Sequence, residues 1–131
     1  MKASFVVNDR AVFEKDKPLP MNLNISKEMS VGNSDNEVIV CLTLRINCDE
    51  QNNFHDNAPF GIEVAYAAQF TWDNEVEEKQ KQTFLAINAP TLLLSYIRPI
   101  VTQLTACSPY PEYHVPFIDM NQLFGKETLN A

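Results

Sequence analysis

Two segments in which every second side chain is apolar constrain the fold of this chain more than any other feature. The first, Glu37 to Asn47, reads EVIVCLTLRIN, and the second, Phe60 to Trp72, reads FGIEVAYAAQFTW. A period of two places alternate side chains on one face of a β-strand. At about 3.3 Å per residue the second strand would extend roughly 40 Å, which is long. The polar connection CDEQNNFHDNAP suits a hairpin between them.

The residues ahead of these segments predict two further strands. MNLNIS, residues 21–26, alternates apolar with polar side chains, and ASFVV and AVFE near the start form one interrupted strand. Pro18 and Pro20 separate the two, because proline cannot donate to a central ladder. We therefore expect a four-stranded, mostly antiparallel sheet.

After Trp72 the apolar period changes to one typical of helices. Asp73 or Asn74 is expected to cap a first helix, one side of which carries Val76, Gln80, Thr83, Phe84 and Ile87. The run Asn88-Ala89-Pro90 predicts a break and the start of a second helix. The apolar stripe of that helix comprises Leu93, Ile97, Ile100, Val101 and Leu104.

The last part of the chain predicts irregular structure and one short helix. Pro99 should kink the second helix because it removes a backbone hydrogen bond. Asp119 and Gln122 have the spacing of a capping box, which predicts a final helix through Phe124. Strands come first and helices last, so we expect an α+β fold. Residues 1–131 are expected to form a single domain.

Charge and hydropathy limit the expected partners and location. The net charge is −7 and the pI is near 4.7, which argues against nucleic acid or an anionic membrane as the main partner. An acidic surface favours basic or unfolded, mixed-charge partners instead. No apolar run approaches the roughly 18 residues that would span a bilayer, and the first ten residues do not resemble a signal peptide. A cytoplasmic location is the expectation.

Residues that carry common chemistries are few. The three glycines, Gly32, Gly61 and Gly125, exclude phosphate-binding glycine loops. The three cysteines, Cys41, Cys48 and Cys107, have no paired spacing and are expected to be free thiols. The two histidines have no second ligand at metal spacing. We expect no metal, no cofactor and no enzymatic activity.

Two catalytic alternatives remain open at the histidines. His55 with Asp56 could activate a water molecule, and Cys107 with His114 could form a nucleophilic pair. The structural alternative is a solvated histidine in one loop and a histidine beside aromatic rings in another.

The segment TACSPYPEYHVPFIDM, residues 105–120, concentrates prolines and aromatic residues in one connection. Its prolines, Pro109, Pro111 and Pro116, fix φ and stiffen the loop. Its rings are then held at fixed angles, and they are Tyr110, Tyr113 and Phe117. Rigid aromatic rings suit adaptable apolar binding. The alternative is that they cap the core over the sheet.

From Glu63 to Phe124 the chain resembles the SecB protein-export chaperones. The segment APTLLLSYIR carries Pro90, Leu93, Tyr96 and Arg98 in register with a family signature, after a matching strand with Glu63, Val64 and Phe70. Tyr110-Pro111 stands where the family has Phe-Pro, and Leu123-Phe124 matches its closing Leu-Phe. NDRAVFE near the start fits more loosely. The ordered set with its spacing, rather than any one match, carries the resemblance.

This resemblance implies a holdase that keeps unfolded polypeptides from collapsing and uses neither ATP nor a cofactor. It implies an α+β protomer with a four-stranded antiparallel sheet, assembled as a dimer of dimers. It also implies a client groove formed partly by the proline-rich loop. The client-binding residues expected from it are Phe70, Trp72, Leu94, Tyr110, Tyr113, Phe117 and Met120.

The resemblance also implies an acidic surface that docks on the secretion motor ATPase, carried over to Asp9, Glu14 and Glu63. A leucine that belongs to this surface is Gly61 here, and no tail like the family's follows Phe124. Client binding is therefore better supported than delivery to the motor. The alternative is a SecB-like chaperone or scaffold outside export, tied to a toxin–antitoxin system or to another partner.

Surplus apolar surface predicts self-association. Leu92 and Leu94 flank the apolar stripe of the second helix, and small residues occupy one face of the long strand, namely Gly61, Ala65 and Ala67. Such surface is usually covered in an oligomer, so a dimer or a homotetramer is expected.

Overall fold

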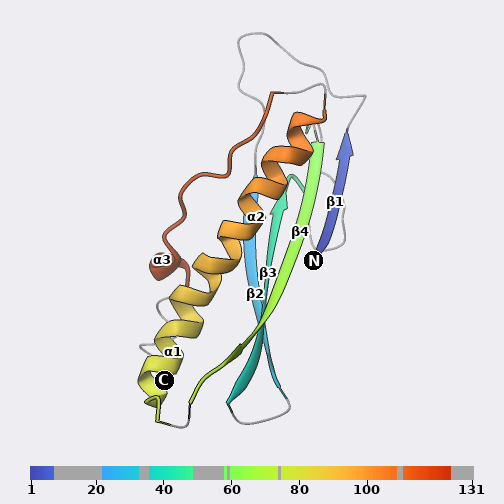
Figure 1. Ribbon diagram of the computed structural model, residues 1–131. Helices are drawn as coiled ribbons and strands as arrows, with labels where there is room; N and C mark the ends of the chain where they lie inside the picture. Colours follow the sequence, from blue (N-terminus) through green and yellow to red (C-terminus); the bar gives the residue numbers. More distant parts are fainter. Residues whose placement is uncertain are drawn as a thin grey trace.

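A computed structural model describes residues 1–7, 22–32, 36–48, 58, 60–73, 75–108 and 111–124. Its four strands are β1 (Lys2–Val7), β2 (Leu23–Val31), β3 (Glu37–Ile46) and β4 (Phe60–Thr71). They form one antiparallel sheet in the order β1-β4-β3-β2, and the helices follow in sequence and cover one face (Figure 1). The predicted α+β class and the four-stranded antiparallel sheet are confirmed.

The alternation seen in the sequence defines the two faces of the sheet. In the register of β3 and β4, Val38 lies opposite Phe70, Leu42 opposite Tyr66, and Leu44 opposite Val64. These residues share the face that the helix covers. The fully or almost fully buried members of this face are Val40, Leu42, Leu44, Ile46, Phe60, Ile62 and Val64.

Strand β2 is longer than its sequence pattern predicted. Alternation was visible over residues 21–26, whereas the strand continues to Val31 at the edge of the sheet. Lys27 interrupts the apolar pattern, yet its register opposite Leu42 places it on the covered face. Pattern alone misses such a residue, because a lysine at an inward position reads as the end of the strand.

The predicted break at Asn88-Ala89-Pro90 is wrong. α1 (Glu78–Thr83), η1 (Phe84–Asn88) and α2 (Ala89–Ala106) form one helix of 29 residues. The five residues of η1 have π-helical hydrogen bonds, and the Ala89 N–H reaches the carbonyl of Phe84. This wider turn carries the chain past Pro90, which has no N–H to give, so the proline changes the hydrogen-bond pattern without ending the helix.

The predicted cap at Asp73 or Asn74 is also wrong. The helix begins at Glu78, with Glu77 at the cap position and no hydrogen bond from a capping side chain. Asp73 instead accepts a turn hydrogen bond from the Val76 N–H at 3.2 Å. Asn74 lies outside the described residues. The residues around position 75 form a turn instead of the start of a helix. The first turn of the helix therefore has neither a side-chain cap nor a buried residue.

The core is the seam between α2 and the inner face of β3 and β4. Leu93, Ile97 and Val101 are 0% exposed on this seam. By length and composition the helix Glu78–Ala106 could cross a membrane. In this structure its apolar seam is covered by the sheet, and burial of that kind explains the same composition.

After α2 the chain runs back along the helix over residues 111–119 and leads into α3 (Met120–Phe124) (Figure 1). The prediction that Asp119 caps this helix is confirmed, because its Oδ1 accepts a hydrogen bond from the Asn121 N–H at 2.9 Å. α3 packs against η1. The return segment therefore places its aromatic residues along α2.

Lys27 joins β2 to η1 and α3. Its Nζ donates a hydrogen bond to the Leu85 carbonyl at 3.4 Å and lies 4.6 Å from the centroid of the Phe124 ring. Pro90 has no N–H with which to continue the π-helical pattern to Leu85. The ammonium group thus satisfies a carbonyl that the helix itself leaves without that donor.

We predict that Lys27→Met lowers the free energy of unfolding by about 1–2 kcal/mol, because the stem is kept while a charge-assisted hydrogen bond and a cation–π contact are lost. Lys79→Met, at an exposed position on α1, is the matched control and should change stability by less than about 0.5 kcal/mol. Urea unfolding at one fixed protein concentration measures both. Equal stability of the two variants would contradict this role of Lys27.

Candidate functional site

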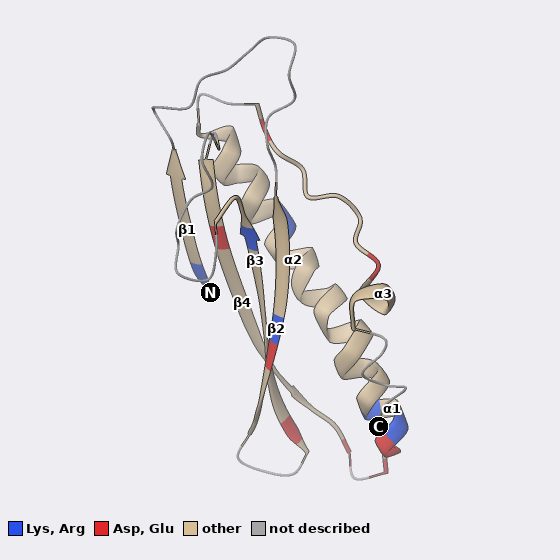
Figure 2. Ribbon diagram, turned by 180° about the vertical axis from the view of Figure 1, so that it is seen from behind, with Lys and Arg blue, Asp and Glu red and all other residues tan. Residues whose placement is uncertain are grey.

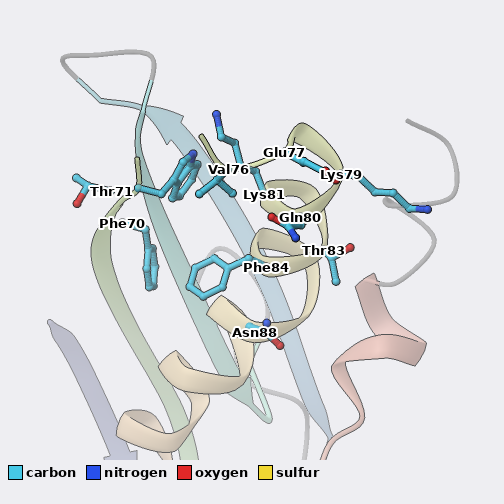
Figure 3. Close-up of a pocket in the computed structure, with 11 residues that line it drawn as sticks. Phe70, Thr71, Val76, Glu77, Lys79, Gln80, Lys81, Thr83, Phe84 and Asn88 are labelled. Carbon is cyan, nitrogen blue, oxygen red and sulfur yellow. The ribbon is translucent and has the colours of Figure 1, made fainter. Parts of the chain in front are cut away.

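A groove lies where the end of β4 meets the first turns of the helix. It has a volume of about 570 Å³. Figure 3 shows side chains from both elements around this space, with the rings of Phe70 and Phe84 next to each other. The residues that line this aromatic groove are Phe70, Thr71, Trp72, Val76, Glu77, Lys79, Gln80, Lys81, Thr83, Phe84 and Asn88.

Three aromatic rings form the wall of the aromatic groove. The Phe70 and Phe84 centroids lie 5.3 Å apart in an edge-to-face arrangement, and those of Trp72 and Phe84 lie 6.4 Å apart. Such pairs are favourable beyond their burial. The backbone N–H of Trp72 donates a hydrogen bond to the Asn36 carbonyl at 3.3 Å. This bond connects the tryptophan to the end of the sheet where β2 and β3 are joined. The wall is therefore built on regular structure.

The rim of the aromatic groove is polar and carries both signs of charge. Lys81 Nζ lies 5.8 Å from the Trp72 ring centroid and 4.0 Å from the Glu78 carboxylate. Figure 2 shows acidic and basic residues together on α1, whereas most of α2 and the return segment carries neither. An apolar wall with a mixed rim accepts apolar side chains without demanding one sign of charge from their neighbours.

Of the seven residues expected to bind clients, two line the aromatic groove, Phe70 and Trp72. Phe84 and Val76 complete it and were not among the expected site residues. Their signal was present, since both belong to the predicted helix side with Gln80 and Thr83. In the sequence, that stripe looks like part of the core. It lines the groove instead because the helix moves away from the sheet at this point.

The return segment holds Tyr113 against α2. The Tyr113 N–H donates to Thr105 Oγ1 at 2.8 Å, and its carbonyl accepts from Thr102 Oγ1 at 3.3 Å. Partial burial raises the pKa of the Tyr113 hydroxyl above its ordinary value. Tyr113 is half-buried and packs on the core. Of the two alternatives for the aromatic residues of this loop, the Tyr113 ring follows the second, because it caps the core.

Phe117 behaves differently from Tyr113. It is 83% exposed, although it stands on a segment whose neighbour Val115 is 2% exposed. A phenylalanine in this position contributes almost nothing to the core, and its expected role in client binding remains a prediction. Tyr110 lies outside the described residues, and its role remains a prediction.

The remaining expected client-binding residues, Leu94 and Met120, lie in the core. They are 5% and 2% exposed and pack with the buried seam of α2. A client would reach them only if the helix or α3 moved. Their assignment to the client surface therefore remains a prediction.

Glu63 is held inside the sheet. Its Oε2 lies 3.0 Å from Arg45 Nε and its Oε1 lies 3.4 Å from Lys2 Nζ, and its side chain is 7% exposed. This arrangement links β1, β4 and β3 and gives Glu63 a structural role. The predicted docking role of Glu63 is not tested by it. Asp9 and Glu14 lie outside the described residues.

Two of the candidate catalytic residues, Cys107 and His114, lie in the part of the chain that the structure describes. His114 Nδ1 lies 3.5 Å from Thr102 Oγ1, and its Nε2 lies 3.5 Å from the Glu112 carboxylate. Cys107 is exposed at the end of α2. Within the described ranges no group of three or more possible metal ligands occurs. His55 and Asp56 lie outside those ranges.

Comparison with known families places this fold and groove in context. A family model described as preprotein translocase subunit SecB matches residues 3–131, nearly the whole chain. The chain belongs to the SecB family. The resemblance read from Glu63 to Phe124 is thereby confirmed and extends over both the sheet and the helices.

Individual SecB relatives are distant. The protein-export protein SecB of Rhodospirillum centenum is 28% identical over 95 residues, covering 72% of this chain and 55% of that protein. The SecB of Idiomarina loihiensis is 28% identical over 118 residues, covering 88% of this chain and 66% of that protein. The chain thus spans between about half and two thirds of the length of these relatives.

One solved structure shares the fold. It is a SecB-like chaperone of Mycobacterium tuberculosis in complex with a ChAD peptide from an antitoxin. The TM-score is 0.66 with 15% sequence identity, and the match covers 90% of this chain and 85% of that one. This similarity supports the sheet-and-helix architecture and confirms the expected SecB-like fold.

We predict that Glu63→Gln lowers the free energy of unfolding by about 2 kcal/mol, because a largely buried carboxylate loses its charge while Arg45 keeps its own. Glu28→Gln, at an exposed position of β2, is the control and should have little effect. Thermal melting compares the two. If both variants melt like the parent, the structural role of Glu63 is wrong, and docking becomes the better account of this residue.

Proposed function

We propose that this protein is an ATP-independent holdase that binds unfolded polypeptides through the aromatic groove and the exposed ring of Phe117. The observation that carries the proposal is the groove itself, an apolar space of about 570 Å³ walled by Phe70, Trp72 and Phe84. SecB family membership supports the same role, since relatives of this chain are named protein-export proteins and the similar solved structure is a SecB-like chaperone.

Unfolded chains have few features in common. They share scattered apolar side chains and a polar backbone, and no fixed shape. A surface that holds many of them needs apolar area with little conformational entropy to lose, which aromatic rings on strands and helices supply. The mixed charges at the rim and the net charge of −7 leave basic and neutral segments free to approach.

Export and non-export versions of the role remain distinct proposals. Delivery of clients to the secretion motor ATPase would need the docking surface expected at Asp9, Glu14 and Glu63. The largely buried carboxylate of Glu63, paired with Arg45 and Lys2, and the glycine at position 61 favour a SecB-like chaperone outside export. Family membership alone supports either version.

Assembly, location and absence of catalysis belong to the same proposal. Two residues of α2, Leu92 and Tyr96, are 44% and 50% exposed and offer apolar area for a second copy of the chain, although the Tyr96 ring also stacks on Tyr66 of β4. We propose a homo-oligomer, a dimer or a dimer of dimers, acting in the cytoplasm. Binding would require no cofactor and no chemical step.

Two single substitutions test which surface captures clients without disturbing the core. Thr83→Asp places a carboxylate in the aromatic groove from an exposed position, and we expect it to weaken suppression of aggregation of a denatured protein at least fivefold, because apolar segments would meet a charge. Gln103→Asp adds the same charge to an exposed site of α2 outside the groove. Light scattering of thermally denatured citrate synthase measures both.

The second comparison uses Phe117→Ser against Val31→Ser, since both side chains are more than 80% exposed and neither belongs to the core. We expect loss of capture for the first and none for the second. All four variants should melt within a few degrees of the parent. Parent-like capture by both Thr83→Asp and Phe117→Ser would overturn the proposed site.

A further inference from the structure

One polar atom in the aromatic groove has no hydrogen-bond partner. Trp72 Nε1 exposes less than 1 Å² of surface. Among the residues that the structure describes, it is the one buried side-chain nitrogen or oxygen atom without a hydrogen-bond partner. Tryptophan usually satisfies this N–H when it is buried. The same tryptophan lines the groove directly after β4 and packs against Phe84 of the helix.

An unsatisfied buried donor is unfavourable in the free protein. It has lost its hydrogen bond to water and gained none in return. A phenylalanine or leucine at this position would fill apolar space without that cost. The indole therefore gives the groove something that an apolar ring cannot, which is a donor that gains a full hydrogen bond once an acceptor arrives.

The acceptor is most readily a peptide carbonyl. An extended polypeptide presents a carbonyl beside every side chain, so one segment can place an apolar side chain against Phe70 and Phe84 and a carbonyl on the indole. A carboxylate would have to give up far more hydration to enter an apolar wall. Glu77 on the rim would oppose that charge as well.

Lys81, on α1, lies over the indole ring. Its Nζ is 5.8 Å from the ring centroid, and its side chain, which is 16% exposed, has the flexible stem of a lysine. α1 has no buried residue and no side-chain cap. A bound segment can thus displace this cover without opening the core under α2.

We propose that the Trp72 indole N–H is the directional anchor of the groove, unpaired in the free protein and hydrogen-bonded to a backbone carbonyl of a bound extended polypeptide. This rests on the proposed function and adds to it. The aromatic wall supplies apolar contact, and the indole fixes where the backbone of the client lies. The consequence is that binding depends on one hydrogen bond as well as on apolar area.

The single tryptophan of the chain makes the test direct. The parent protein, labelled with ¹⁵N, gives one indole cross-peak, and it is titrated with a tryptophan-free, C-terminally amidated peptide rich in leucine and valine. We expect the indole proton to move downfield and to exchange more slowly with water as the peptide saturates. The amide end excludes a terminal carboxylate as the acceptor.

The matched variant is Trp72→Phe, which keeps an aromatic ring and removes the donor. We expect its dissociation constant for the same peptide to rise about tenfold, the ratio expected for one hydrogen bond. Tyr66→Phe, which loses a hydroxyl outside the groove, should bind like the parent. Thermal melting of both variants shows whether the fold is kept, and the indole signal of the parent decides the matter if Trp72→Phe is unstable.

The outcomes separate the two proposals. If the parent binds the peptide while its indole signal stays unchanged, or if folded Trp72→Phe binds within twofold of the parent, the anchor is wrong and the groove can still hold clients. If the parent binds neither the peptide nor an unfolded protein, the proposed function fails and takes the anchor with it.

Discussion

The packing of α2 on the inner face of β3 and β4 is the interaction on which the rest of this structure depends. Leu93, Ile97 and Val101 are fully buried there, and each contributes roughly 1.5–3 kcal/mol relative to exposure. The helix is longer than this seam. Toward its first residues no side chain of α1 is buried, so the seam ends before the helix does. The aromatic groove occupies the space where the two elements part.

Continuity of the helix across Pro90 is what makes this geometry possible. A break at that point would free α1 to fold back on the sheet and fill the groove. The π-helical turn of η1 carries the chain past the proline, and Lys27 donates to the Leu85 carbonyl beside it. A residue that looks out of place on an apolar face thus stabilises the element that keeps the groove open.

The sequence predicted those parts of the fold that depend on local pattern. The alternation at residues 37–47 and 60–72 predicted the two central strands and their inner face, and Asp119 predicted the start of α3. Prediction from the sequence failed where an unfavourable residue is compensated by a residue from another part of the fold. Lys27 inside β2 and Pro90 inside the helix compensate each other, because the lysine donates to a carbonyl that the proline leaves without a donor. The two residues lie far apart in the sequence, so no local pattern shows this.

The site was predictable in composition and less so in arrangement. Phe70 and Trp72 were expected, whereas Phe84 read as core because its stripe is continuous with that of α2. Leu94 and Met120 have the same apolar character as the groove residues, yet they pack inside. Whether an apolar side chain on this chain belongs to the core or to a binding wall depends on where the helix leaves the sheet, which is a property of the assembled layers.

Hydrogen–deuterium exchange of the full chain, with and without reduced and carboxymethylated α-lactalbumin, tests the central claim most directly. If clients bind in the aromatic groove, protection on binding should concentrate on the amides from Phe70 to Asn88 and on residues around Phe117. The amides of β2 should be unchanged. Protection confined to the outer face of the sheet, or none at all in the presence of bound client, would contradict the account.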